Sequence, residues 1–334
     1  MVSSRDVAKY AGVSQPTVSR VLNNPSKVSQ PIVDNVRKAM KDLNYRPNNI
    51  ARSLVSNRTK TIALVSGPLH NPFFVDTTTA IVNYAASKGY YTTVHFENHY
   101  DNMSIYETVL SQQVDGIVLS SIFINDPIFD ELKESGKPFV MFNRRHETGG
   151  HFVELDNHQA GVIGAEHLVS LGHKAIAWIG GTTEASTFLG RLEGFRDKLK
   201  NNGIQLNKDF ILQTDTTEKD IHRAIQQLFL RRNKPTAIFA ATDSIAIFVI
   251  DCLLKMGFSI PEEISICSVD NLGISAHESL QLTSIGHNSN KSMGLIAIQN
   301  LIKIIENQRK LEDEQQITLE PELYLRQTTS AIKP

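Results

Sequence analysis

The chain contains 334 residues, of which 41% are hydrophobic and 21% charged, a balance typical of a soluble globular protein with two or three domains. No run approaches the roughly 18 apolar residues that span a bilayer, and no apolar stretch of signal-peptide length follows the first residue, so we do not expect a membrane protein. The formal net charge is −1, so the chain as a whole is neither strongly basic nor strongly acidic.

Charge is nevertheless distributed unevenly along the chain. Residues 1–60 contain eleven Lys/Arg and three Asp/Glu (+8), whereas the rest contains 23 and 32 (−9). A basic head on an acidic body favours a polyanionic partner for the head alone. The two cysteines, Cys252 and Cys267, lie in apolar runs, which indicates buried thiols in a reducing compartment. We therefore expect a cytoplasmic protein.

Residues 6–23 predict two short helices around a tight turn. Gly12 ends the first helix and Ser14 is placed to cap the second, in which Pro16 occupies the first turn, where its missing N–H is harmless. The second helix has one apolar side. Its other side carries residue types that contact base edges and phosphates: Gln15, Thr17, Ser19, Arg20 and Asn23. Such a helix-turn-helix is typical of a DNA reader, and an ordinary helical hairpin with a solvated polar face is the alternative.

A third helix completes this N-terminal region. Ser3 and Asp6 form a capping-box-like pair before the first helix, and Ser29 is placed to cap a helix that runs to about Leu43. Three short helices around one small core predict a headpiece of about fifty residues.

The basic, polar segment 45–58 contains a predicted short helix that Asn48 could cap. A helix of about two turns is not stable alone in water, so we expect it to form only when DNA holds it. Leu54 is a candidate wedge between base steps in the minor groove, and a flexible linker with one stray leucine is the alternative.

From Thr61 onward, short apolar runs alternate with helix-length amphipathic segments. The runs that predict strands are Ile62–Val65, Thr92–Phe96, Gly116–Leu119, Phe139–Phe142, Ala175–Ile179, Ala237–Ala241 and Ile264–Val269. Helices are predicted at about 73–88, 104–113, 157–171, 190–202, 218–231 and 244–256. Four glycines fall where C-caps belong: Gly89, Gly172, Gly203 and Gly257. The alternation predicts parallel sheets covered on both faces, with ligands at the carboxyl ends of the strands.

Taken together, these stretches resemble the lactose/galactose repressor family of bacterial transcription regulators over nearly the whole chain. The matching motifs are Asp6-Val7-Ala8, Gly12-Val13-Ser14, Thr17-Val18-Ser19-Arg20, Leu43-Asn44-Tyr45, Pro47-Asn48, Ala51-Arg52-Ser53-Leu54, Gly190-Arg191-Leu192-Glu193-Gly194-Phe195 and Val269-Asp270-Asn271. The resemblance implies an all-α headpiece and an α/β body with two lobes like those of a periplasmic sugar-binding protein. The implied domains are a headpiece at 1–46, a hinge helix and linker at 47–60, and a body at 61–334. Lobe 1 would comprise about 61–157 and 288–317, and lobe 2 about 158–287 and 318–330, with three chain crossovers.

The resemblance also implies a function. The chain would be a ligand-regulated repressor of a carbohydrate or related catabolic operon, binding a pseudo-palindromic double-stranded DNA operator as a homodimer. An effector in the cleft would shift the angle between the lobes and so bias the hinge segments. A sugar, sugar phosphate, sugar acid or nucleoside fits the sequence about equally well. A protein corepressor in place of the small effector, and an enzyme body acting on a small molecule, are the alternatives.

In the headpiece, three residues match the base-reading positions of the family: Gln15, Pro16 and Arg20. Arg20 can grip a guanine bidentately, whereas Pro16 offers only apolar contact and leaves the operator sequence open. Phosphate contacts are expected from Ser14, Thr17, Ser19 and Asn23. Ala51 and Leu54 match the minor-groove contacts of the hinge, to which Asn48 belongs.

In the cleft, Arg191 and Asp270 match effector-binding positions, and together they can fix vicinal hydroxyls or a heterocycle edge. Phe73 and Phe74 follow a predicted Asn-Pro turn and could stack on an apolar ligand face. Further candidates at or beyond strand ends are Ser121, Asn143, Arg144, Phe188, Thr216, Thr242 and Asp243. The alternatives are that Phe74 faces the lobe core or a dimer interface, and that Asp243 only caps the following helix.

No other pattern predicts catalysis, a metal or a cofactor. The chain has no HExxH, no CxxC and no nucleophile elbow. His95 and His99 are four apart, but His95 lies in a strand-like run. Gly180-Gly181-Thr182-Thr183 lacks the Gly-Lys-Ser/Thr ending of a P-loop.

Overall fold

The computed structural model describes residues 2–45, 58–97, 103–289 and 291–332. The chain forms two compact units, Met1–Thr59 and Lys60–Pro334, and each is described by itself. None of the helices in the described ranges is both long and apolar enough to cross a membrane.

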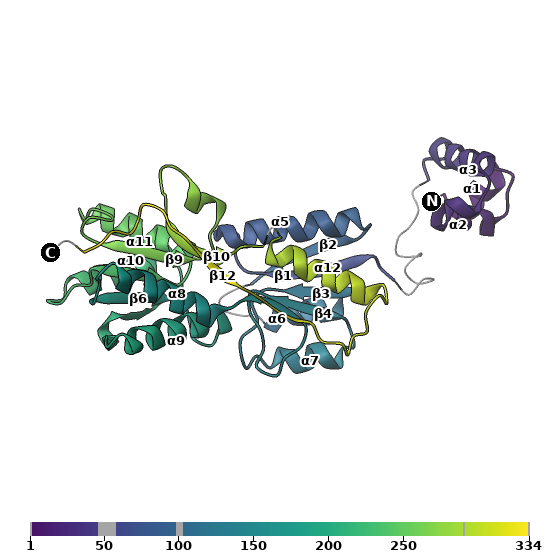
Figure 1. The fold of residues 1–334 in the computed structure, drawn as a ribbon. Coiled ribbons are helices and arrows are strands. Elements are labelled where there is room, and N and C mark those ends of the chain that lie inside the picture. Colours follow the sequence, from purple (N-terminus) through teal and green to yellow (C-terminus); the bar gives the residue numbers. More distant parts are fainter. Residues whose placement is uncertain (1, 46–57, 98–102, 290, 333–334) are drawn as a thin grey trace. The chain divides into compact units, whose positions relative to one another are not determined.

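The first unit is a three-helix headpiece (Figure 1). It contains α1 (Ser4–Tyr10), α2 (Gln15–Asn23), a 3-10 turn η1 (Pro25–Lys27) and α3 (Gln30–Asp42). These elements enclose one small apolar core: Val7, Ala8, Ala11, Val18, Val21, Val33, Val36 and Ala39. The core is built from the predicted apolar sides of the helices, which leaves the polar face of α2 outside.

Helix capping in the headpiece follows the predictions with one exception. Ser3 and Asp6 form a complete capping box, and the Ser14 hydroxyl accepts a hydrogen bond from the Thr17 N–H. Gly12 lies in the left-handed region at φ 63°, which glycine adopts without strain. Ser29 occupies the N-cap position of α3, as predicted, but its side chain makes no capping hydrogen bond, so that part of the prediction is wrong.

The second unit contains two six-stranded sheets, each of which forms the centre of a lobe (Figure 1). Lobe 1 holds β1 (Thr61–Ser66), β2 (Tyr91–Phe96), β3 (Gly116–Leu119), β4 (Phe139–Phe142), β5 (Phe152–Leu155) and β11 (Gln316–Leu319), in the order β11-β5-β4-β3-β1-β2. Its helices are α5 (Pro72–Ser87), α6 (Met103–Ser111), α7 (Ile128–Glu134) and α12 (Met293–Ile305). Along β1, Ile62 and Leu64 belong to the core with α5 and α12, whereas Ala63 and Val65 belong to the core with α6 and α7. This alternation is the period of two that a doubly covered strand requires.

Lobe 2 repeats the plan with the order β12-β10-β9-β8-β6-β7. Its strands are β6 (Ile176–Gly180), β7 (Ile211–Gln213), β8 (Ala237–Ala240), β9 (Ser265–Val269), β10 (Thr283–His287) and β12 (Pro321–Tyr324). Its helices are α8 (Asn157–Ser170), α9 (Ser186–Asn201), α10 (Glu218–Phe229) and α11 (Asp243–Lys255), with 3-10 turns η2 (Lys208–Phe210) and η3 (Gly273–Ala276). Among the described strands, all pairs are parallel except β10 with β12. The single tryptophan, Trp178, is fully buried in β6.

The seven predicted strands and six predicted helices are confirmed with small shifts of their ends. The four C-cap glycines all have positive φ. Five strands were missed (β5, β7, β10, β11 and β12) because they are short or polar, and α7 and α12 were missed among the helices. Both cysteines are free and buried, as predicted.

The chain passes between the two sheets three times within the described residues, after β5, after β10 and between β11 and β12. Immediately after the first passage, α8 packs against α9 at very short range through glycines. A Cβ atom on Gly161 would lie 2.2 Å from the Arg191 carbonyl oxygen, and one on Gly194 would lie 1.9 Å from the His158 carbonyl oxygen. The two helix backbones therefore touch, and α8 and α9 form one stiff unit.

We expect Gly194→Ala to lower the free energy of unfolding by about 2–3 kcal/mol, because the new methyl group meets backbone that cannot rotate away. Urea unfolding of the full chain, followed by the fluorescence of Trp178, measures this. Gly273→Ala is the matched control, since a Cβ there has open space, and it should change the unfolding free energy little. Equal effects of the two substitutions would contradict the close helix contact.

Candidate functional site

The polar face of α2 is the candidate DNA-reading surface. Gln15, Pro16, Ser19 and Arg20 are exposed on it. Thr17 is half-buried, and its hydroxyl lies 2.8 Å from that of Ser14. The side chain of Asn23, and the hinge candidates Asn48, Ala51 and Leu54, lie outside the described residues.

A cavity of about 250 Å³ lies between the two lobes. Most of its wall comes from residues just beyond the carboxyl ends of strands and from the first turns of the helices that follow, as expected for parallel sheets. Lobe 1 contributes Pro68, His70, Asn71, Phe73, Phe74, Glu97, Phe123, Asn143 and Arg144. Lobe 2 contributes Gly181, Thr182, Thr187, Phe188, Arg191, Thr214, Asp215, Thr216, Thr242, Ser244, Ile245, Phe248 and Asp270.

The structure brings most of the predicted cleft residues together around this cavity. Those that line it are Phe73, Phe74, Asn143, Arg144, Phe188, Arg191, Thr216, Thr242 and Asp270. Two predicted residues, Ser121 and Asp243, do not line it. The lobes also meet directly across the rim, where the Ser244 hydroxyl donates to Asn71 Oδ1 at 2.7 Å.

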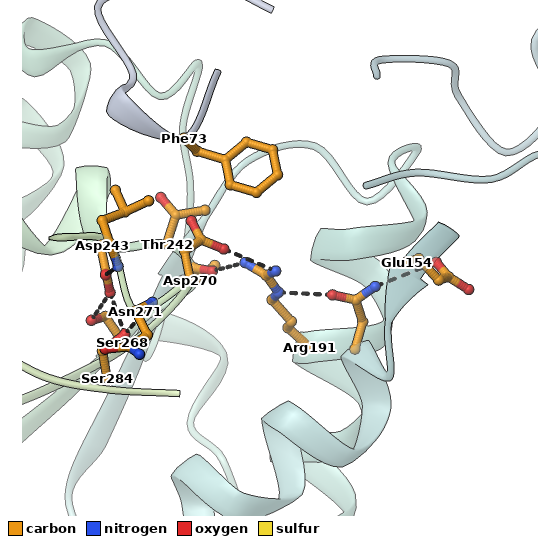
Figure 2. Close-up of polar contacts among 12 residues, drawn as sticks. Phe73, Glu154, Arg191, Thr242, Asp243, Ser268, Asp270, Asn271 and Ser284 are labelled. Carbon is orange, nitrogen blue, oxygen red and sulfur yellow. Dashed lines mark hydrogen bonds and ion pairs between the residues drawn. The ribbon is translucent and has the colours of Figure 1, made fainter. Parts of the chain in front are cut away.

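The placement of Asp243 in the cleft was wrong because its carboxylate points into lobe 2. Asp243 is fully buried and accepts hydrogen bonds from the hydroxyls of Ser268, Ser275 and Ser284 at 2.5 Å each, and from the Leu272 N–H at 2.8 Å (Figure 2). Burial raises the pKa of Asp243, and the hydroxyl donors oppose that rise. Asp243 therefore ties the ends of β9 and β10 to the loop that follows Asp270.

Asp243 is not the N-cap of α11 either, because the Thr242 side chain takes that role and accepts a hydrogen bond from the Ile245 N–H.

The prediction that Ser121 lines the cleft was also wrong. Its side chain is buried outside the cavity wall, and its backbone carbonyl accepts a hydrogen bond from Arg144 Nη1 at 3.0 Å. Ser121 thus contacts the lining residue Arg144 without lining the cavity itself.

Arg191 and Asp270 form the buried polar centre of the cavity. Arg191 Nη2 lies 3.1 Å from Asp270 Oδ1, and the two side chains are 2% and 5% exposed (Figure 2). Arg191 Nη1 donates to the Ala241 carbonyl, and Nε donates to Asn157 Oδ1 at 2.9 Å. Burial raises the pKa of Asp270 to about 7, against the lowering effect of Arg191. The carboxylate charge of Asp270 therefore depends on the guanidinium beside it.

Phenyl rings supply the apolar part of the wall, and two of them sit on glycines in equivalent places of the two lobes. A Cβ on Gly67, after β1, would lie 2.3 Å from Phe74 Cε2, and one on Gly181, after β6, would lie 2.4 Å from Phe188 Cε2. Phe73 meets Phe74 edge to face, with ring centroids 5.2 Å apart. Only glycine at the strand end lets each ring lie against the backbone.

Three cavity residues other than glycine have left-handed backbone, namely Asn143 at φ 68°, Thr216 at φ 65° and Asp270 at φ 122°. A β-branched residue such as Thr216 rarely adopts this region, and such strain concentrates at ligand sites. Asn143 and Asp270 directly follow β4 and β9, and Thr216 lies three residues beyond the end of β7, so each of these backbone turns lies at the cavity wall.

Sequence reasoning missed several lining residues. Glu97 directly follows β2, whose end at Phe96 was predicted correctly, so the strand-end rule could have found it. Thr214 directly follows β7, a strand that was missed. Phe123 lies in a loop and Phe248 in the second turn of α11, and no local sequence signal marks either residue.

Burial lowers the pKa of Arg144, and the nearby Glu97 carboxylate opposes that shift.

In the part of the chain that the structure describes, one group of side chains outside the cavity has the spacing of metal ligands. Single ligand atoms of Glu218, His222 and Asp251, on α10 and α11, lie within 4.8 Å of one another. Lys255 Nζ already donates to Asp251 Oδ2 at 2.6 Å, and His222 Nε2 lies 3.3 Å from the same oxygen. These contacts make the group an ion-paired surface cluster of the two helices.

Comparison with known proteins places both units in one family. Residues 5–48 match the family of bacterial regulatory proteins of the lacI type, and residues 59–328 match the periplasmic binding proteins and sugar binding domain of the LacI family. The HTH-type transcriptional repressor PurR of Erwinia tasmaniensis is 31% identical over 99% of this chain and 97% of its own length. PurR of Photobacterium profundum is 30% identical over 98% of each chain.

Solved structures give the same result. The Lac repressor dimer bound to operator and the anti-inducer ONPF is 26% identical, with a TM-score of 0.86 over 99% of each chain. The complex of the transcriptional regulator CelR with cellobiose is 26% identical, with a TM-score of 0.72 over 98% of this chain and 100% of that one. The chain therefore belongs to the LacI family of bacterial regulatory proteins and is a DNA-binding transcriptional repressor with a ligand-binding body.

Proposed function

We propose that this repressor binds a pseudo-palindromic operator as a homodimer in the cytoplasm, and that an uncharged sugar in the inter-lobe cavity regulates the binding. The observation that carries the proposal is the Arg191–Asp270 pair at the centre of a cavity walled by phenyl rings. A guanidinium donates and a carboxylate accepts, so the pair matches adjacent hydroxyl groups, and phenyl faces match the C–H faces of a sugar ring.

The charges around the cavity favour a neutral ligand over a sugar acid or a sugar phosphate. The lining includes two guanidinium groups, Arg144 and Arg191, and three carboxylates, Glu97, Asp215 and Asp270. Arg191 is already paired with Asp270, and Glu97 favours the charged form of Arg144. An anionic ligand would bring further negative charge to a wall in which carboxylates outnumber guanidinium groups.

The size of the cavity favours a small sugar. Its volume of about 250 Å³ lies just below the usual range for small-molecule sites, about 300–1,000 Å³. Relatives point the same way, since the matched domain family is described as sugar-binding and CelR is solved with cellobiose. We therefore propose a mono- or disaccharide.

A thermal-shift screen of the full chain tests the ligand class. Neutral sugars (D-ribose, D-glucose, D-galactose and cellobiose) are compared with gluconate, glucose 6-phosphate and adenosine. A neutral sugar should stabilise the protein by about 2.7 kcal/mol at a hundredfold excess over its Kd. The same sugar should change operator affinity, upwards for a corepressor or downwards for an inducer.

Arg191→Ala should abolish that stabilisation, because it removes the donor and leaves the Asp270 carboxylate buried without its partner. Lys198→Ala serves as the control, since it also removes a cation from α9 but lies in a partly exposed pair with Glu166. Stabilisation by the acid, the phosphate or the nucleoside alone would contradict the neutral-sugar proposal. A flat screen with operator binding intact would favour a protein corepressor.

Replacement of an exposed arginine on α2 tests the DNA-reading surface. Arg20→Ala should weaken operator binding by about 1–3 kcal/mol and relax the preference for one base pair, because a bidentate guanine contact is lost. Arg37→Ala, at an exposed position of α3, removes the same charge and should weaken all sequences alike. Measurement against operator variants at fixed salt separates the two, and identical losses would show that Arg20 contributes charge alone.

A further inference from the structure

A ring of polar contacts, closed by the backbone of α9, joins the proposed effector cavity to the first crossover between the lobes. Arg191 Nε donates to Asn157 Oδ1 at 2.9 Å, and Asn157 Nδ2 donates to Glu154 Oε2 at 3.4 Å (Figure 2). Arg145 Nε donates to the other oxygen of Glu154 at 2.8 Å. The Arg145 N–H then donates to the Ser186 hydroxyl at 3.1 Å, on the helix that also carries Arg191.

The members of this ring belong to different lobes. Glu154 lies in β5 of the lobe 1 sheet, and Arg145 follows β4 of the same sheet. Asn157 is the first residue of α8, and Arg191 lies in α9, both in lobe 2. Only two residues separate Glu154 from Asn157, so their hydrogen bond spans the chain crossing itself. A change in the angle between the lobes acts directly on that bond.

Water is largely excluded from the centre of the ring. Arg191 is 1% exposed, Asn157 6% and Glu154 8%. Burial raises the pKa of Glu154, and the partly exposed Arg145 opposes the rise. A buried donor or acceptor that loses its partner has no water to replace it, so the ring members hold one another in place.

The lobe 2 side of the ring is stiff, because the glycine contact joins α8 and α9. A Cβ on Gly190 would lie 2.9 Å from the Asn157 Cβ, next to Arg191. Asn157 and Arg191 therefore move together. The contacts that can change are those between the lobes, Asn157 with Glu154 and Arg145 with Ser186.

We infer that Asn157 is a positioning residue whose hydrogen bond to Glu154 couples the effector-binding guanidinium of Arg191 to the angle between the lobes. The inference rests on the proposed effector site. A ligand that shifts or fixes Arg191 shifts the Asn157 amide, and the amide favours the lobe angle at which Glu154 accepts its hydrogen bond. The ligand thus acts through a difference in contact between two lobe arrangements, as coupling requires.

Exchanging the amide at position 157 and the carboxylate at position 154 tests the Asn157–Glu154 hydrogen bond. Asn157→Asp keeps an acceptor for Arg191 Nε but places a carboxylate against Glu154. Glu154→Gln keeps an acceptor for either Arg145 or Asn157 but not for both. In the double variant, the new amide at position 154 can donate to the new carboxylate at position 157 while the amide oxygen accepts from Arg145, so the bond returns with its direction reversed. His158→Ala, the next residue of α8, is the control, because it removes only an exposed contact with Asp197.

Two measurements on the full-length protein decide the outcome. The first uses whichever neutral sugar, among D-ribose, D-glucose, D-galactose and cellobiose, most stabilises the wild type. It is the ratio of the operator Kd measured with that sugar to the operator Kd measured without it. Each single variant should bring this ratio closer to one by a factor of about five or more, with sugar affinity in Asn157→Asp within a few-fold of the wild type. The double variant should recover the ratio to within about twofold, and His158→Ala should leave it unchanged.

The second measurement needs no sugar. Spin labels at Glu134→Cys in α7 and Lys200→Cys in α9, both exposed positions, report the distance between the lobes. The distribution should broaden in each single variant and narrow again in the double variant. Unchanged distributions in the single variants, or a double variant that is not rescued, would overturn the inference. A wild type that responds to no sugar would overturn the proposed function, and the label distances would still decide the role of Asn157.

Discussion

Placing a guanidinium beside a carboxylate out of water is costly unless both groups are paired and hydrogen-bonded, and the Arg191–Asp270 pair imposes this requirement on lobe 2. The two side chains of this pair are almost fully buried, and Arg191 Nη2 lies 3.1 Å from Asp270 Oδ1. The serine cluster around Asp243 fixes the strand ends and the loop on the Asp270 side. The glycine contact of α8 with α9 fixes the backbone that carries Arg191. The serine cluster and the α8–α9 contact thus each hold one partner of the ion pair in place. The polar centre is therefore assembled before a ligand binds.

Both lobes pack a phenylalanine ring against a glycine at equivalent positions. In each, a glycine directly follows the first strand, and a phenylalanine from the following helix lies on it: Phe74 on Gly67 and Phe188 on Gly181. The rings face a common cavity from opposite lobes. The polar part of the wall also comes from both lobes, since lobe 2 supplies the buried Arg191–Asp270 pair and lobe 1 supplies Glu97, Asn143 and Arg144. Both the apolar and the polar parts of the wall are therefore shared between the lobes.

Much of this arrangement was predictable from the sequence, and the exceptions have physical causes. Nine predicted residues line the cavity, and five of them were identified by their position at or beyond strand ends, because parallel strands end at one edge of a sheet. Of the other four, Arg191 and Asp270 came from the family resemblance, and Phe73 and Phe74 from the turn after the first strand. The rule failed for Asp243, which follows a strand but turns inward to three hydroxyls contributed by residues 25 to 41 positions away. It could not find Phe248, which reaches the cavity from a helix, or Asn157, whose role depends on the contact of two helices. Short strands such as β5 and β11 were missed because their identity depends on pairing rather than on local pattern.

The order of the strands along the chain has a consequence for synthesis. β11 completes an edge of the first sheet and β12 an edge of the second, and both lie within residues 316–324. Because the ribosome makes a chain from its N-terminus, neither lobe has all its strands until this late segment has emerged. The headpiece is a separate compact unit with its own core and can fold much earlier. During translation, the nascent chain can therefore hold a folded DNA-reading domain before it holds the ligand-binding body that regulates it.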